Sequence, residues 1–276
     1  MTPSHRTPAV VRLTALLICM LTGLSAPHTL RAETTATQPN PPDLNAMVVA
    51  AVKRMPQGCG YEASQDRITS LGESITFDGR ALHADPRAAA PTFCSAATYL
   101  VFLSVIEQLR QSGSIELPAD AGNALLVRSQ PDGTGVWGRW NANGPGTARL
   151  FQETGLGSNF TNWERARPGD FLKIFWTDEI GSRERGHSVV FLGKSVDADG
   201  TATLTYWSSN QPEGYAKATI PRSRVRRAVF SRLEHPERIR DGARLPESDA
   251  YLADMLRRPG TEDEMLSMTG VLKPAP

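Results

Sequence analysis

The chain is poor in the residues that build disulfide frameworks and metal centres. Its 276 residues contain 3 cysteines and 5 histidines. No CxxC pair and no histidine pair with ligand spacing occurs, so neither a metal site nor a disulfide-stapled fold is expected. The formal net charge is only +1. This excludes bulk electrostatic attraction to nucleic acid, and we expect no nucleic-acid partner.

Long apolar runs are lacking as well, with one exception near the amino terminus. Residues 13–26 (LTALLICMLTGLSA) are apolar, follow Arg6 and Arg12, and are too short for a comfortable membrane span. Residues 30–32 (LRA) offer a cleavage site. The pattern predicts a signal peptide over residues 1–32 and a periplasmic or extracellular product without stable membrane insertion. An uncleaved anchor is the alternative.

The remaining chain divides into a linker, one domain and a tail. Residues 33–42 are polar and contain proline, which is typical of a linker. Residues 43–258 are enough to bury one sizeable core, so we expect a single domain there. Residues 259–276 begin with a Pro-Gly pair and are expected to be loosely ordered.

The order of the expected elements indicates the fold class. Apolar stripes at helical spacing predict helices early in the chain, at 43–55, 64–71 and 93–110. Short runs rich in β-branched and aromatic residues predict strands later, at 171–176, 186–193, 203–210, 216–220 and 225–233. Because no helix separates these strands, we expect an antiparallel meander. The fold class is therefore α+β, with the helix at 93–110 packed on a carboxy-terminal sheet.

Cys94 is the candidate nucleophile. It falls in the first turn of the helix predicted at 93–110. Thr92, a favoured N-cap residue, directly precedes that helix. Unpaired N–H groups and the positive end of the helix dipole favour thiolate over thiol there. A small core residue is the alternative reading of Cys94. Cys59 is either a free thiol or the disulfide partner of Cys94, in which case both would be structural.

His187 is the candidate base, because it begins the strand predicted at 186–193. By alternation it shares a face with Val189 and Phe191. If that face is turned toward the helix, the imidazole can approach Cys94. A structural or merely exposed histidine is the alternative.

The next expected strand offers the residue that would orient the imidazole. Tyr206, Ser208 and Asn210 share one face of that strand. The Asn210 side chain can accept from one ring nitrogen and leave the other to take the thiol proton. Ser208 is the second choice for this role and a candidate substrate contact. A turn-forming role for Asn210 is the alternative.

Trp137 and Trp140 are candidates for substrate binding. They lie in a segment rich in glycine and asparagine, residues 137–146 (WGRWNANGPG). Two indoles in such a loop could line a groove that stacks on sugar or peptide. Packing of both rings against the domain is the equal alternative.

These residues together resemble a known superfamily. The run at 167–176 (RPGDFLKIFW) contains a Pro-Gly-Asp turn and a strand, and the run at 186–193 (GHSVVFLG) is a His-led strand ending in glycine. With the upstream Cys94-Ser95 pair, they resemble the NlpC/P60 and CHAP superfamily of papain-like cysteine amidases and peptidases. The resemblance covers roughly residues 91–211. That family often has a tyrosine upstream of its cysteine, but Tyr61 lies far from Cys94 in sequence and receives no role.

The resemblance implies a papain-like fold and a reaction. Cys94 would be the nucleophile, His187 the general base and Asn210 the orienting residue. The substrate would be amide bonds in bacterial cell-wall peptides, attacked by the thiolate without any cofactor. An acyltransferase or lipid hydrolase using the same triad is one alternative. A non-catalytic wall-binding module is another, because fold resemblance does not determine function.

Overall fold

The computed structural model describes residues 42–271. The predicted signal peptide at 1–32 and the linker up to residue 41 lie outside the described residues. The helices are α1 Leu44–Arg54, α2 Gln65–Glu73, α3 Cys94–Gln111, α4 Ala119–Ala124, α5 Gly135–Asn141, α6 Gly146–Thr154, α7 Ala250–Asp254 and α8 Glu262–Met268, with 3-10 turns η1 Arg222–Arg224 and η2 Pro236–Arg244. Within residues 42–271, no helix combines the length and apolarity that a bilayer span requires.

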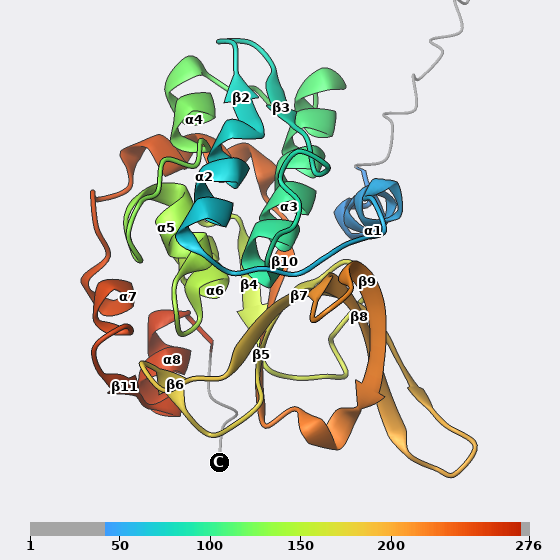
Figure 1. The fold of residues 1–276 in the computed structure, drawn as a ribbon. Helices are drawn as coiled ribbons and strands as arrows, with labels where there is room; N and C mark the ends of the chain where they lie inside the picture. Colours follow the sequence, from blue (N-terminus) through green and yellow to red (C-terminus); the bar gives the residue numbers. More distant parts are fainter. Residues whose placement is uncertain (1–41, 272–276) are drawn as a thin grey trace, which may run out of the picture. The chain divides into compact units, whose positions relative to one another are not determined.

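Six of the seven strands of the main sheet come after α1–α6 in the chain, which establishes the α+β class. The strand order of this sheet is β1-β9-β8-β7-β5-β10-β4, and every neighbouring pair is antiparallel. The bounds are β1 Gly58–Cys59, β4 Gly157–Phe160, β5 Phe171–Phe175, β7 Gly186–Val196, β8 Ala202–Asn210, β9 Gly214–Pro221 and β10 Arg227–Leu233. Two small hairpins pair β2 Ile75–Phe77 with β3 Leu82–Ala84 and β6 Ile180–Gly181 with β11 Pro259–Gly260. In Figure 1 the blue and green helices lie beside the yellow and orange strands.

The expectation of a simple meander is correct for four strands and wrong for the fifth. Strands β5, β7, β8 and β9 pair in sequence order, but β10 pairs with β5 and not with β9. Val229 and Phe230 of β10 are both fully buried, and they belong to different apolar clusters. A strand that is apolar on both faces needs cover on both faces, which a place between β5 and β4 provides.

Helix α3 is buried on almost all sides and forms the centre of the larger core. Its apolar residues pack against Val190 of β7 and Trp207 of β8, on one face of the sheet. The observed bounds, Cys94–Gln111, lie within one residue of the predicted helix. Val189 and Phe191 of β7 point the other way, into a second apolar cluster on the opposite face.

The Pro-Gly-Asp turn before β5 is held by a buried carboxylate. Asp170 is fully buried and accepts from Arg232 of β10 at 2.8 Å on each oxygen. It also accepts from the Asn45 side chain of α1 at 2.9 Å. Gly169 has φ +99°, and a Cβ there would lie 2.3 Å from the Asn45 carbonyl oxygen. The Asp170 carboxylate of this motif therefore connects α1, β5 and β10. Glycine is required at position 169 because any side chain there would collide with the backbone of α1.

The expectation of a loosely ordered tail from residue 259 is wrong for residues 259–271. The β11 strand pairs with β6, and Thr261 caps α8 by accepting the Glu264 N–H at 3.1 Å. Met265 of α8 is fully buried in an apolar cluster with Met255. A short amphipathic helix that follows an N-cap signal can dock on the domain even when a Pro-Gly pair precedes it.

Candidate functional site

Cys94 is the first residue of α3, where the helix leaves backbone N–H groups unpaired. The N-cap residue is Phe93, and it makes no side-chain cap. Thr92 therefore does not cap the helix as expected, and its buried hydroxyl has no hydrogen-bond partner. The Thr92 carbonyl instead accepts from the Ser209 hydroxyl at 2.8 Å and from the Glu62 N–H at 3.1 Å. These bonds fix the start of α3 against β8.

The sulfur meets the sheet where two strands separate. The β7–β8 ladder ends at Val190 paired with Trp207, although β7 continues beside β5 down to Gly186. The Ser188 N–H, past the last β7–β8 pair, hydrogen-bonds to the Cys94 sulfur. The opening between β7 and β8 thus supplies a backbone donor for the thiolate.

His187 lies between the sulfur and Asn210. Its imidazole hydrogen-bonds to the Cys94 sulfur. Its Nε2 atom is 3.0 Å from Oδ1 of Asn210, at the end of β8. The Asn210 amide nitrogen donates to the Ala216 carbonyl at 2.9 Å, so Oδ1 is the atom that accepts from the ring. Nε2 therefore carries a proton, and Nδ1 is the nitrogen available to the thiol.

These contacts shift both pKa values. Burial alone raises the pKa of the Cys94 thiol, but the hydrogen bond and charge of His187, the Ser188 N–H and the Lys173 ammonium outweigh it and lower the pKa to about 7. Burial lowers the pKa of His187, whereas bonding to Cys94 and Asn210 raises it above its ordinary value overall. The arrangement favours a thiolate–imidazolium pair, the form a nucleophilic cysteine needs.

The His187 ring reaches the sulfur by a different route from the one expected. Its strand alternation places it on the face of Val189 and Phe191, away from α3. The ring lies 6.1 Å from Trp176 and 5.6 Å from Tyr206, measured between ring centroids. The contact forms because Cys94 stands at the open end of the sheet, where the two faces meet.

A groove of about 510 Å³ opens over the Cys94 sulfur. Its walls are mostly polar and come from separate parts of the chain. The polar lining includes Tyr61, Gln65, Asp132, Asn141, Asn143, Lys173 and Glu184.

Tyr61 lies in this groove although no role was expected for it. Burial together with the nearby Cys94 charge raises the pKa of Tyr61 to about 12. Gly58, Cys59 and Gly60 before it all have positive φ. The two glycines indicate a tight bend, but the sequence does not indicate that the chain after this bend places Tyr61 in the groove.

Trp137 and Trp140 do not line this groove. Both indoles are fully buried, and they pack on Tyr99 at centroid distances of 5.2 and 5.4 Å. The segment expected to be a loop forms the α5 helix, and of the two alternatives, packing against the domain describes the structure. Ser208 is also fully buried, with its hydroxyl donating to the Ser188 carbonyl at 2.7 Å. Ser208 does not line the groove, and its hydroxyl braces β7 where the ladder opens, while Asn210 is the residue that contacts the His187 ring.

Cys59 and Cys94 are both free thiols. Cys59 is exposed on β1, and its sulfur lies 3.5 Å from the Gln57 carbonyl oxygen. No bridge locks Cys94, so the disulfide alternative does not describe this structure.

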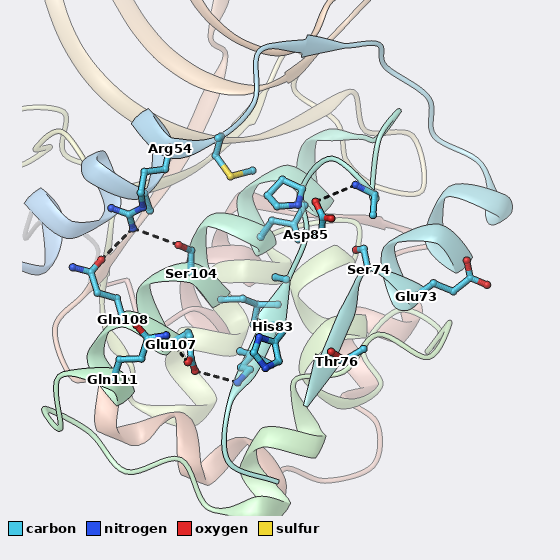
Figure 2. Close-up of a pocket in the computed structure, with 18 residues that line it drawn as sticks. Arg54, Glu73, Ser74, Thr76, His83, Asp85, Ser104, Glu107, Gln108 and Gln111 are labelled. Atoms are coloured by element: carbon cyan, nitrogen blue, oxygen red, sulfur yellow. Dashed lines mark hydrogen bonds between the residues drawn. The ribbon is translucent and has the colours of Figure 1, made fainter. Parts of the chain in front are cut away.

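A second cavity lies away from the thiol. It has a volume of about 770 Å³ and is lined by α1, α3 and the β2–β3 hairpin. Figure 2 shows His83 there, among Ser104, Glu107 and Gln108. The Ser104 hydroxyl accepts from Arg54 at 3.4 Å, and His83 faces Asp78 at 3.8 Å. No histidine–nucleophile contact occurs in this cavity, so the Cys94 groove is the better candidate.

Among residues 42–271, no cluster of three or more His, Cys, Asp or Glu side chains could hold a metal ion. The groups around the Cys94 sulfur are the His187 imidazole, the Ser188 N–H and the Lys173 ammonium. Comparison of the chain with models of protein families, with curated proteins and with solved structures finds no match.

Proposed function

We propose that this chain is an exported cysteine hydrolase that cleaves amide bonds in cell-wall peptides. The observation that carries the proposal is that His187 interacts both with the Cys94 sulfur and with Asn210, whose Oδ1 lies 3.0 Å from Nε2 of the ring. The residue order and the placement of the cysteine at a helix start are those of papain-like enzymes. The resemblance of residues 91–211 to the NlpC/P60 and CHAP superfamily supports the choice of substrate.

The reaction follows from the roles of these groups. The Cys94 thiolate attacks the amide carbonyl, and the oxyanion is stabilised by the Cys94 N–H at the start of α3. The His187 imidazolium then gives its proton to the leaving amine, and the acyl-enzyme forms. Neutral His187 takes a proton from water, which attacks the thioester and releases the acid. Asn210 keeps the ring in the tautomer that presents Nδ1 to the sulfur throughout.

The polar walls of the groove suit a peptide more than an acyl chain. Asn141 and Asn143 can pair with peptide amides, and Asp132 and Glu184 add carboxylates beside the thiol. An acyl chain would displace water from these polar groups without offering hydrogen bonds in return, which costs free energy. This contrast favours the amidase over the lipid-hydrolase alternative.

The test uses purified peptidoglycan and the protein without its signal peptide. We expect release of new amino groups, measured by dinitrophenylation, and its loss in Cys94→Ala and His187→Ala. Cys59→Ala is the matched control, because Cys59 is an exposed free thiol outside the groove. It should retain the activity.

Two results would overturn the proposal. One is fatty-acid release from lipid without any new amine from peptidoglycan. The other is wall binding that survives Cys94→Ala while no bond is cleaved, which would identify a binding module.

A further inference from the structure

An ion pair lines the Cys94 groove and has no role in the triad. Lys173 of β5 donates to Glu184 at 2.7 Å, and their side chains are only 11% and 5% exposed. Glu184 is fixed from the other side by the N–H groups of Gly144 at 2.6 Å and Gly181 at 2.9 Å. Its carboxylate therefore holds the ammonium in one place, which a flexible lysine chain alone would not ensure.

The position of Lys173 in the sheet places this residue in the same groove as Cys94. Lys173 pairs across the ladder with Ser188, whose N–H bonds to the Cys94 sulfur. Space for the ion pair depends on Gly186, because a Cβ there would lie 2.8 Å from the Lys173 ammonium and 2.9 Å from Glu184. Lysine inside the otherwise apolar strand FLKIF is thus accommodated by a glycine on the neighbouring strand.

We propose that Lys173 is a positioning residue for the nucleophile: held by Glu184, its ammonium keeps the Cys94 sulfur in the thiolate form. This inference deepens the proposed hydrolase function and rests on it. Among the described residues that line the groove, Lys173 is the only lysine or arginine. A cation close to a sulfur in a partly buried site stabilises the anion more than it would in water.

Other groups also face the sulfur and must be held constant in a test. His187 bonds to it from β7, while Tyr61 and Tyr206 lie close enough for its charge to raise their pKa values. Asp132 faces the same groove, and burial raises its pKa. The variants below change none of these side chains.

The test measures the rate of Cys94 alkylation by iodoacetamide against pH, in a Cys59→Ala background with a single thiol. Iodoacetamide is neutral, so a changed groove charge does not alter its approach. Two variants are compared. The single variant Glu184→Gln keeps an oxygen that accepts from the Gly144 and Gly181 N–H groups. The double variant Glu184→Gln with Lys173→Met differs from the single variant only in lacking the ammonium. Comparing these two avoids leaving a buried carboxylate unpaired, which would risk unfolding.

We expect Lys173→Met to move the thiol midpoint up by about one unit in this background. At pH 6 the thiolate is then about tenfold scarcer but more nucleophilic, so alkylation slows about threefold. Lys173→Arg alone should keep the midpoint. Lys194→Met is the control, because Lys194 pairs with Glu164 at 2.6 Å on an exposed part of β7 and carries the same charge.

Two outcomes would overturn the inference: an unmoved midpoint when Lys173→Met is added to Glu184→Gln, or an equal shift in Lys194→Met. The readout is independent of substrate turnover. A missing amidase activity would overturn the proposed function, whereas a missing shift would overturn the role of Lys173.

Discussion

Asn210 accepts a hydrogen bond from Nε2 of His187 over 3.0 Å, at the end of the sheet where β7 and β8 no longer pair. The Asn210 amide nitrogen is already bound to the Ala216 carbonyl of β9. The side chain is therefore fixed in orientation by one strand while it orients a residue on another. This geometry makes Asn210 the first residue to test after Cys94 and His187.

Replacing Asn210 should weaken catalysis without unfolding the protein. In Asn210→Ala the His187 ring loses the acceptor that fixes its tautomer, and we expect kcat to fall about ten- to a hundredfold. Amine release from peptidoglycan provides the rate, and thermal unfolding checks the fold. Asn123→Ala on the exposed surface of α4 is the matched control, since Asn123 bonds only to the Ala119 carbonyl of its own helix. A rate unchanged in Asn210→Ala would contradict the orienting role.

The alkylation rate of Cys94 should follow a titration near neutrality. Its pKa is lowered to about 7, so the rate should rise through pH 7 and reach a plateau above pH 8. An ordinary thiol titrates near pH 8.5, so at pH 6 Cys94 has about thirtyfold more thiolate and, after correction for its weaker nucleophilicity, reacts about sixfold faster.

The His187 pKa is raised, so activity should fall again at a pH above the ordinary histidine value, when the imidazolium loses its proton. The measurement of alkylation uses the Cys59→Ala background. If the midpoint of Cys94 alkylation equals that of a model thiol, the result would contradict a thiolate–imidazolium pair between Cys94 and His187.

Trp140 should matter for stability and not for substrate affinity. Its indole N–H donates to the Ser95 carbonyl at 3.1 Å, directly behind the nucleophile, and its ring stacks on Phe102 at 4.9 Å. Trp140→Phe keeps an aromatic ring but loses that bond, so we expect unfolding to become easier by about 1–3 kcal/mol. Urea denaturation gives the free energy, and KM for a soluble wall peptide should not change. A large rise in KM with unchanged stability would instead support the alternative that Trp140 stacks on the substrate.

The Pro-Gly-Asp turn should be a major source of stability. Asp170→Asn removes the charge that pairs with the buried Arg232 guanidinium, and we expect a loss of about 3 kcal/mol. Asp178→Asn is the matched comparison, because Asp178 contacts Arg226 and Arg227 on the exposed surface. Removing that exposed pairing should cost much less stability, because water screens the charges. Equal losses in the two variants, measured by urea denaturation, would contradict the buried-anchor interpretation of Asp170.

Local patterns were sufficient for the elements that carry the candidate triad. The apolar stripe of α3 and the β-branched runs of β5, β7 and β8 predict these elements to within a few residues. Lys173 could have been noticed as the one charge inside an apolar strand. Its partner Glu184 could not, because nothing in the sequence indicates that the β6–β7 connection folds back over β5.

The sequence by itself determined the α+β class, the helix in whose first turn Cys94 lies, the strand near whose start His187 lies, and the strand that ends at Asn210. These features depend on interactions between residues a few positions apart, which periodicity and turn residues report. Only the tertiary structure decided that β10 inserts beside β5, that both tryptophans are buried, and that Tyr61 and Lys173 face the thiol. Those outcomes depend on which surfaces cover one another, and the β7–β8 separation that admits the sulfur arises from that packing rather than from any local signal.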